Sequence, residues 1–287
     1  MSRIAYVNGR YLRHAEAAVH IEDRGYQFAD GVYEVCGLRD GKLMDERLHM
    51  ERLARSLDAL RIAMPVAPAA LGLILREVVR RNGLTRDAGL VYLQVTRGVA
   101  PRDHPFPARP VNPSIVVTAK RLNMARIEAA LSQGVSVITL PDQRWGRCDI
   151  KSVGLLPNIL AKQTAREAGA YEAWLVDREG FVTEGSSTNA WIVDREGHLV
   201  SRPEGPDILS GVTRKVLLEA ARSEGMKVVE RPFTPEEAKS AREAFISASS
   251  AILLPVTQVD GQPVGNGAPG SLSLRLREAY MRHCELS

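Results

Sequence analysis

One lysine in the middle of the chain has an unusual setting for a charged residue. Lys151 is surrounded by apolar neighbours that favour burial, namely Ile150, Val153, Leu155 and Leu156. Burial removes water from the ammonium group and favours the free amine, which is a nucleophile toward an aldehyde. The alternative is a lysine whose stem lies on apolar surface and whose amine stays in water. The choice between the two depends on partners elsewhere in the chain.

A second group combines a carboxylate with several hydroxyls. Residues 183–191 read Thr-Glu-Gly-Ser-Ser-Thr-Asn-Ala-Trp, so Glu184 lies beside a glycine and is followed by Ser186 and Ser187. Such a passage from strand to loop could bind a polar ligand. A polar hairpin turn would have the same composition.

Two stretches and one arginine could bind a phosphate. Gly211-Val212-Thr213 lies where a helix is expected to begin, so its backbone N–H groups would point at an anion. The hydroxyl-rich run 247–250, which includes Ser249, follows an expected strand, and Arg52 could supply positive charge. Because most Ser and Thr residues at helix starts are simple caps, none of these signals is specific alone.

Arg102, His104 and Tyr33 form a possible carboxylate trap. An arginine can donate two parallel hydrogen bonds to a carboxylate, and a nearby donor can complete the pocket. The alternative for Arg102 and His104 is a solvated loop with incidental charges.

Composition limits the classes of protein. The chain has 287 residues, 45% hydrophobic and 25% charged, which is typical of globular proteins. A net charge of +4 with scattered basic residues gives no stripe for nucleic acid. Three cysteines without CxxC spacing indicate no disulfide framework and no metal site. With no membrane-spanning run or signal peptide, the sequence predicts a cytoplasmic protein.

The periodicity predicts which elements position these groups. The elements expected in the first half are a hairpin at 4–12, an ordered loop at 21–30, a strand from 31, helices at 45–62 and 68–82, and strands at 90–97 and 114–118 around an irregular loop at 98–107. Those expected in the second half are a helix ending at 133, a strand at 135–140, a helix at 158–167, a meander with turns at 177–180 and 194–197, a helix from 211, a capped helix from 234, strands at 245–247 and 255–259, and a helix at 270–283.

Mixed strands and helices in two successive blocks predict an α/β or α+β protein of two domains. We expect a smaller N-terminal domain at 1–120 and a larger C-terminal domain at 121–287 that carries Lys151.

The whole chain resembles one superfamily. The stretches that carry the resemblance are Glu22-Asp23-Arg24-Gly25-Tyr26-Gln27-Phe28, Gly31-Val32-Tyr33-Glu34-Val35, Arg147-Cys148-Asp149-Ile150-Lys151-Ser152, Leu160-Ala161-Lys162-Gln163 and Thr183-Glu184-Gly185-Ser186-Ser187. They are similar to those of the fold-type IV pyridoxal-phosphate enzymes, and Arg102-x-His104 resembles the D-amino acid aminotransferases among them. The resemblance implies a two-domain fold with the cofactor, pyridoxal 5'-phosphate, at the domain interface.

The resemblance also implies roles for single residues. Lys151 would hold the cofactor as a Schiff base and move the proton, and Glu184 would bond the pyridine nitrogen. The positions that would bind the cofactor phosphate are Arg52, Val212, Thr213 and Ser249. Leu209 would pack on the ring, and Ser187 would contact both cofactor and substrate.

Tyr33, Arg102 and His104 would bind the substrate α-carboxylate. In the family the loop with this arginine and histidine reaches the neighbouring subunit, which implies a homodimer with a shared active site. The implied reaction moves an amino group between D-amino acids and 2-oxo acids, such as D-alanine and 2-oxoglutarate, by a ping-pong mechanism.

Several alternatives stay open. Within the superfamily they are a branched-chain L-amino acid aminotransferase, an (R)-selective amine transaminase and an aminodeoxychorismate lyase. Gly37 stands where relatives carry bulkier or charged residues, so the range of accepted side chains or amines is open. From another class, the chain could be a ligand-binding protein without catalysis.

Overall fold

The computed structural model describes residues 3–287, which divide into two compact units. Unit 1 contains the chain up to Leu122 together with Ile150–Gly154 and Glu285–Ser287, and unit 2 contains Asn123–Asp149 and Leu155–Cys284. The expected C-terminal domain included the lysine segment, whereas Lys151 lies in unit 1. The reason is a pairing that no local pattern predicts: residues 150–154 hydrogen-bond to a strand of unit 1.

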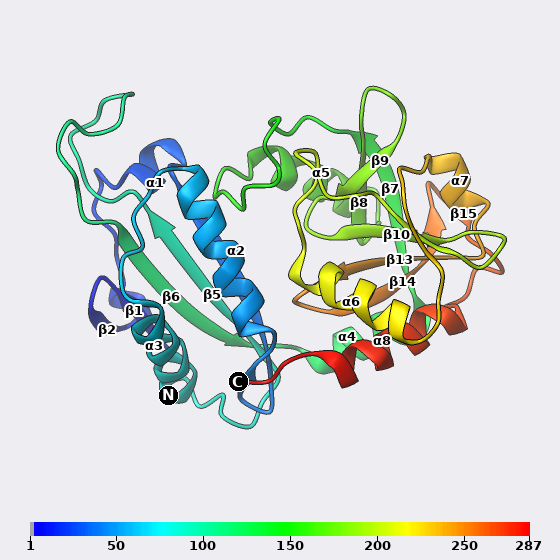
Figure 1. Ribbon diagram of the computed structural model, residues 1–287, viewed down its shortest axis with the longest axis horizontal. Helices are drawn as coiled ribbons and strands as arrows, with labels where there is room; N and C mark the ends of the chain where they lie inside the picture. The colour runs from blue at the N-terminus through cyan, green and yellow to red at the C-terminus, as the bar shows by residue number, and fades with distance from the viewer. Residues whose placement is uncertain (1–2) are drawn as a thin grey trace. The chain divides into compact units, whose positions relative to one another are not determined.

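Unit 1 is built on a six-stranded sheet in which every pairing is antiparallel (Figure 1). Its strands, in chain order, are β1 (Ile4–Val7), β2 (Arg10–Arg13), β3 (Gly31–Arg39), β4 (Lys42–Leu43), β5 (Gly89–Thr96) and β6 (Ser114–Arg121). The order across the sheet is β2-β1-β6-β5-β3-β4. The hairpin expected at 4–12 is confirmed: Asn8 and Gly9 both have positive φ, as a two-residue turn requires.

The helices of unit 1 are the 3-10 helix η1 (His14–Glu16), α1 (Arg24–Phe28), α2 (Glu46–Ala59) and α3 (Pro68–Arg81). The two longest, α2 and α3, pack on the sheet and close the core, whereas η1 has no buried residue. α2 contacts β3, and α3 contacts β1 and β6. Leu53, Leu57, Leu75 and Val78 are buried there, so the helical spacing of apolar residues predicted both helices correctly.

The expectation of a loop at 21–30 is wrong for part of that range, because α1 forms a short helix. Asp23 caps it by accepting a hydrogen bond from the backbone N–H of Gly25 at 2.8 Å, and Ala29 ends it with a left-handed conformation. A side chain on Gly25 would lie 2.2 Å from Thr96. The helix therefore depends on a cap and on close packing against β5, which the apolar periodicity does not reveal.

Unit 2 is built on a mixed nine-stranded sheet. Its strands are β7 (Val135–Pro141), β8 (Glu172–Val176), β9 (Val182–Gly185), β10 (Asn189–Val193), β11 (Leu199–Ser201), β12 (Val228–Glu230), β13 (Glu243–Ala248), β14 (Ile252–Val259) and β15 (Gln262–Pro263). The main order is β12-β11-β10-β13-β14-β7-β8-β9, and β15 pairs with β14. β7 lies between β14 and β8 and is parallel to both. The expected mixture of strands and helices is confirmed in both units.

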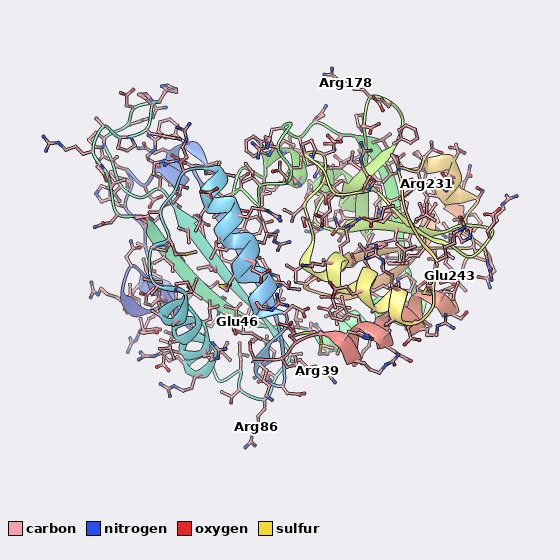
Figure 2. The ribbon with its side chains drawn as sticks, in the orientation of Figure 1. Arg39, Glu46, Arg86, Arg178, Arg231 and Glu243 are labelled. Carbon is pink, nitrogen blue, oxygen red and sulfur yellow. The ribbon has the colours of Figure 1, made fainter. Side chains whose placement is uncertain are left out.

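Helices border the sheet of unit 2. They are α4 (Met124–Gln133), α5 (Leu156–Glu167), α6 (Val212–Ser223), α7 (Pro235–Lys239) and α8 (Ser271–His283). The expected cap of α7 is confirmed, because Thr234 accepts a hydrogen bond from the backbone N–H of Glu237 at 3.1 Å. Glu243 of β13, labelled in Figure 2, accepts hydrogen bonds from the backbone N–H groups of Leu272 and Ser273 and so anchors the start of α8.

Within residues 3–287, no helix has both the length and the apolar character needed to cross a membrane.

Candidate active site

Lys151 is attached to strand β3 through its own backbone. The C=O of Lys151 accepts a hydrogen bond from the N–H of Tyr33 at 3.0 Å, and the N–H of Val153 donates to Gly31 at 3.0 Å. The Lys151 Nζ lies 4.1 Å from the centre of the Tyr33 ring. The lysine is half-buried, and its amine lies over the ring of Tyr33, a residue expected to bind the substrate carboxylate. The structure therefore brings Lys151 and Tyr33 together.

The apolar neighbours of Lys151 do not all bury it, contrary to the expectation from sequence. Ile150 joins the core of unit 1, but Leu156 starts α5 and is 66% exposed. The surroundings of the amine are set by β3 and by the Tyr33 ring, which stacks on Tyr92 with ring centres 5.7 Å apart. Burial, with the nearby Tyr33, raises the pKa of Tyr92 to about 12, so this phenol stays neutral.

Arg52 of α2 is paired with a carboxylate that the sequence did not single out. Its Nε and Nη2 donate to the two oxygens of Glu34 on β3, each at 2.8 Å. His49 Nδ1 lies 2.7 Å from the same carboxylate. Burial alone would raise the pKa of Glu34, but the charge and hydrogen bonds of Arg52, with His49, hold it far below its usual range. Arg52 is thus a rigidly oriented cation.

Arg102 and His104 lie together on an exposed loop of unit 1. The guanidinium carbon of Arg102 is 4.9 Å from the centre of the Phe28 ring. The ring centre of His104 is 5.6 Å from that of Phe28. No hydrogen bond, ion pair or ring contact joins either residue to Lys151 or Tyr33 in the described chain. Of the predicted carboxylate trap, the structure groups the two loop residues and leaves Tyr33 apart.

Glu184 of β9 is the centre of a hydrogen-bond network in unit 2. The residue is 6% exposed, and its carboxylate forms an ion pair with Arg144. Asn189 Nδ2 donates to it at 3.0 Å, and the backbone N–H of Leu209 lies 3.2 Å from both oxygens. The structure therefore brings Glu184 and Leu209 together, two of the residues expected around the cofactor ring.

Arg144 also holds a second carboxylate. It donates to Asp142 at 2.7 Å and to the backbone C=O of Asp207 at 2.9 Å. Burial alone would raise the pKa of Asp142, but the hydrogen bonds and charge of Arg144 hold this pKa below its ordinary value. Burial and nearby carboxylates raise the pKa of Cys148 to about 11, which keeps this thiol protonated and unreactive.

Asn189 links Glu184 to the start of α6. Gly211 is the N-cap of α6, and no side chain caps the helix. A Cβ on Gly211 would lie 2.1 Å from the Asn189 side-chain oxygen, so glycine is required by this close approach. Val212 and Thr213 follow as the first two helical residues, and both are buried. Their backbone N–H groups have no partner within a helix, as at any helix start.

Ser187 and Ser249 share no hydrogen-bond partner in the described chain. Ser187 donates to Glu172 at 2.9 Å, and Glu172 is wholly buried with Lys162 Nζ 3.3 Å from it. Ser249 lies in the turn after β13, and in the described chain its hydroxyl has no hydrogen-bond partner.

Three polar residues of the site were missed by sequence reasoning. Glu34 had a signal, because it alternates onto the buried side of β3 with Val32 and Cys36. A carboxylate there needs a basic partner, and Arg52 lies toward the buried side of α2. Asn189 also had a signal, because it stands in the polar stretch 183–191 that contains Glu184. Arg144 had none, since it reaches Glu184 only through the fold.

The family is decided by comparison with known sequences. The sequence profile of the family described as amino-transferase class IV matches residues 31–259, most of the chain. The chain belongs to the class IV aminotransferases. The structural comparison agrees with the expected fold type.

Named relatives of this class IV aminotransferase extend over nearly its whole length. It is 43% identical over 272 residues to the D-alanine aminotransferase of Bacillus licheniformis, covering 95% of this chain and 94% of the relative. It is 38% identical over 280 residues to the D-alanine aminotransferase of Staphylococcus epidermidis, covering 98% and 97%.

Solved structures similar to it include branched-chain amino acid aminotransferases. The enzyme of Escherichia coli matches with a TM-score of 0.89 at 25% identity, covering 98% of this chain and 94% of that one. The enzyme of the archaeon Thermoproteus uzoniensis, solved with norvaline, matches with a TM-score of 0.85 at 25% identity, covering 100% and 99%.

The residues present in the class IV aminotransferase fit pyridoxal phosphate. The start of α6 offers amides that no side chain caps, which suits a phosphate. Glu184 is a buried carboxylate that could face a protonated ring nitrogen, and Lys151 supplies a primary amine. These groups match the phosphate, the pyridine nitrogen and the aldehyde of the cofactor in turn.

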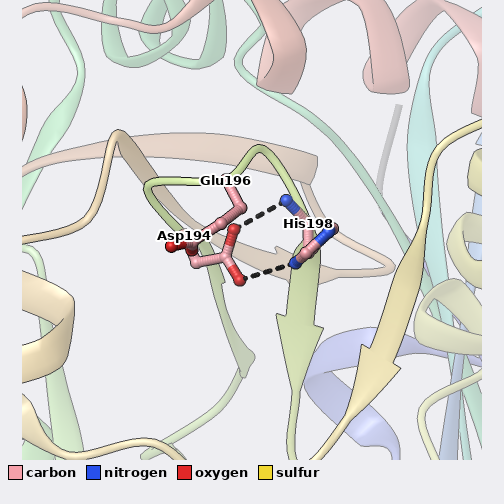
Figure 3. Close-up of side chains that lie close together, drawn as sticks. All are labelled: Asp194, Glu196 and His198. Carbon is pink, nitrogen blue, oxygen red and sulfur yellow. Dashed lines mark hydrogen bonds and ion pairs between the residues drawn. The ribbon is translucent and has the colours of Figure 1, made fainter.

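One cluster outside these groups has the composition of a metal site. Asp194, Glu196 and His198 have ligand atoms within 4.8 Å of one another (Figure 3). His198 donates its backbone N–H to Asp194 at 2.7 Å. Residues 177–180 have the same sequence as residues 194–197, and there Asp177 accepts the same hydrogen bond from the backbone N–H of Phe181. Phenylalanine is not a metal ligand, so this bond forms without any metal. The cluster is therefore explained by the chemistry of the turn.

Proposed function

We propose that this class IV aminotransferase uses pyridoxal phosphate to move the amino group between D-amino acids and 2-oxo acids. The observation that carries the proposal is the 43% identity to a D-alanine aminotransferase over 95% of the chain. Arg102 and His104, held on one aromatic ring, support it, because they offer two basic groups to an α-carboxylate.

Lys151 is the residue that would bind the cofactor aldehyde and then act as the proton carrier. Its backbone is fixed to β3 by hydrogen bonds on both sides of the residue, which limits where the amine can reach. A positioned amine that removes a proton from the substrate Cα and returns it at the former aldehyde carbon contributes about 10²- to 10⁴-fold to the rate.

Glu184 would hold the pyridine nitrogen in its protonated form. When bound, the cofactor ring accepts the electron pair that the substrate Cα–H bond leaves behind. Arg144 and Asn189 orient the carboxylate of Glu184, and Leu209 lies beside it through its backbone N–H. We infer that Leu209 packs on the ring.

The phosphate would be bound by neutral donors and one cation. The amides of Val212 and Thr213 open α6, Ser249 has a hydroxyl without a partner in the described chain, and Ser187 adds a hydroxyl that donates to Glu172. Arg52 would supply the charge, with its direction set by Glu34.

Tyr33, Arg102 and His104 would select the substrate. A pocket that fixes the α-carboxylate decides which antipode presents its Cα–H to Lys151, and therefore sets D against L specificity. In this proposal the protein is a homodimer in which Arg102 and His104 serve the active site of the neighbouring subunit. A cytoplasmic location stays a prediction from the sequence.

A branched-chain L-amino acid aminotransferase is the second candidate. The observation in its favour is the high structural similarity to such enzymes, with TM-scores of 0.89 and 0.85. Fold similarity at 25% identity is a weaker guide to substrate than 43% sequence identity. The amine transaminase, the lyase and a non-catalytic binding protein are further outcomes of the same test.

The test combines a substrate panel with a lysine variant. The purified protein with pyridoxal phosphate is assayed with D-alanine, L-alanine, L-leucine and (R)-1-phenylethylamine against 2-oxoglutarate. We expect D-alanine to be preferred, and we expect Lys151→Ala to lose both activity and the visible absorbance of the bound cofactor. Lys120→Ala, at an exposed lysine of unit 1, is the matched control. Preference for L-leucine would overturn the D-specific proposal, and a colourless wild-type protein would overturn catalysis.

A further inference from the structure

The loop with Arg102 and His104 is fastened to the helix α1 at two levels. At its base, the backbone N–H of Arg24 donates to Gly98 at 2.9 Å and that of Ala100 donates to Glu22 at 3.3 Å. At its tip, the side chain of Arg24 reaches the backbone of residues 103 and 104. Loops are ordinarily the mobile parts of a fold, so such attachment needs a cause.

Arg24 is a buried cation that binds the loop backbone. It is 3% exposed, and its Nε donates to Asp30 at 2.8 Å. Its two terminal nitrogens point at the C=O groups of Asp103, at 2.7 Å, and His104, at 3.4 Å. Asp30, which also pairs with Arg97, balances part of the Arg24 charge. The other donors of Arg24 fix the chain direction at residues 103 and 104.

Phe28 arranges the side chains above that backbone. Its ring lies 4.8 Å from the Arg24 guanidinium carbon and 4.9 Å from that of Arg102, and its centre is 5.6 Å from the centre of the His104 ring. Arg102 has no ion pair or hydrogen bond within the described chain, so its guanidinium is held by the Phe28 ring. The donors of Arg102 therefore stay available while the ring restricts where the guanidinium lies.

We propose that Arg24 and Phe28 are the positioning residues of the carboxylate-binding loop: Arg24 fixes its backbone, and Phe28 holds Arg102 and His104 side by side before substrate binds. The inference deepens the proposed function and rests on it. A preformed pair of basic groups loses less conformational entropy when a carboxylate binds, so the effect falls on substrates that carry one.

The first measurement is hydrogen–deuterium exchange of the holoenzyme without substrate. Phe28→Leu removes the ring, Phe28→Tyr keeps it, and Tyr11→Leu removes a ring from beneath another arginine of unit 1, Arg81, at 4.1 Å. We expect faster exchange in residues 98–113 for Phe28→Leu alone. Unchanged exchange in that segment would overturn the inference whatever the substrates of the enzyme are.

The second measurement separates binding from catalysis. For Phe28→Leu we expect the KM for D-alanine to rise about two- to fivefold, the equivalent of one cation–π contact, with kcat nearly unchanged. The KM for a primary amine without a carboxylate should not move, and Phe28→Tyr should restore the KM for D-alanine. An equal change for both substrates, or none for D-alanine, would overturn the inference. A wild-type enzyme inactive with D-amino acids would instead overturn the proposed function.

Discussion

The guanidinium of Arg52 and the carboxylate of Glu34 form a bidentate ion pair inside unit 1, with two N–O distances of 2.8 Å. The side chains are 6% and 1% exposed. Water therefore compensates neither charge, and each depends on the other together with His49. The pair therefore contributes to the stability of unit 1 independently of any role in an active site.

Glu34→Gln should destabilise the protein strongly. The amide cannot balance the Arg52 charge, and leaving one partner of a buried pair alone costs about 3 kcal/mol or more of unfolding free energy. Denaturant unfolding at neutral pH measures the loss. Glu77→Gln is the control, because Glu77 pairs with Arg80 and Arg81 at the surface and should change stability little. Similar losses in both variants would contradict the argument.

Acid should abolish part of the stabilisation that Asp142 provides. Its pKa lies below the ordinary 3.8 because the hydrogen bonds and charge of Arg144 outweigh burial. A group with a lowered folded pKa stabilises fully above its unfolded pKa, and this stabilisation is lost as pH falls through the folded pKa. Asp142→Asn should thus be less stable than the wild type at neutral pH, and the difference should shrink below about pH 4.

Urea midpoints of both proteins across that range check this dependence. Asp40→Asn is the control, since Asp40 is 82% exposed in its side chain. A gap between Asp142→Asn and the wild type that stays constant down to the acid limit would show that Asp142 acts through shape and not through charge.

The local elements were predictable because their signals are local. The turn at Asn8–Gly9 needs positive φ, and the buried leucines of α2 recur at helical spacing. The attachment of Lys151 to β3 was not predictable, since it joins segments more than a hundred residues apart. For the same reason the sequence predicts Lys151 in the C-terminal domain, whereas the residue lies in unit 1.

The site follows the same division. Glu184 was found because its motif is contiguous, and Asn189 stands in the same stretch, whereas Arg144 reaches Glu184 from a segment 40 residues away. The helix α1 was missed because five residues are too few to show a helical repeat of apolar residues. An aspartate such as Asp23 is also as typical of a turn as of a helix cap.

Gly98→Ala should loosen the loop that carries Arg102 and His104. Gly98 has φ +103, which L-residues rarely adopt, and a Cβ there would lie 2.1 Å from the backbone oxygen of Asn112. We expect a stability loss of at least about 1 kcal/mol and a raised KM for D-amino acids. Thermal unfolding and steady-state kinetics measure the two effects. Gly146→Ala, with nothing within 4 Å of the added carbon, should change neither.

Arg144→Gln should alter how the cofactor is held without removing any residue that would contact it. Arg144 pairs with Glu184 and Asp142 together, so its loss leaves two nearby buried carboxylates without their shared cation. Glu184 would then lose the cation that orients it, while Asn189 and the Leu209 amide still donate to it.

We expect Arg144→Gln to release pyridoxal phosphate more readily on dialysis, to shift the visible absorbance of the bound cofactor, and to lower kcat about tenfold, near the low end for loss of a supporting contact. Absorbance during dialysis and single-turnover kinetics measure these effects. Arg147→Gln is the matched control: Arg147 pairs with Asp149 at the surface, three residues along the same segment. Removing a charge that orients Glu184 should change the environment of the ring nitrogen and hence the spectrum. If both variants kept the cofactor and the wild-type spectrum, Arg144 would have only a structural role.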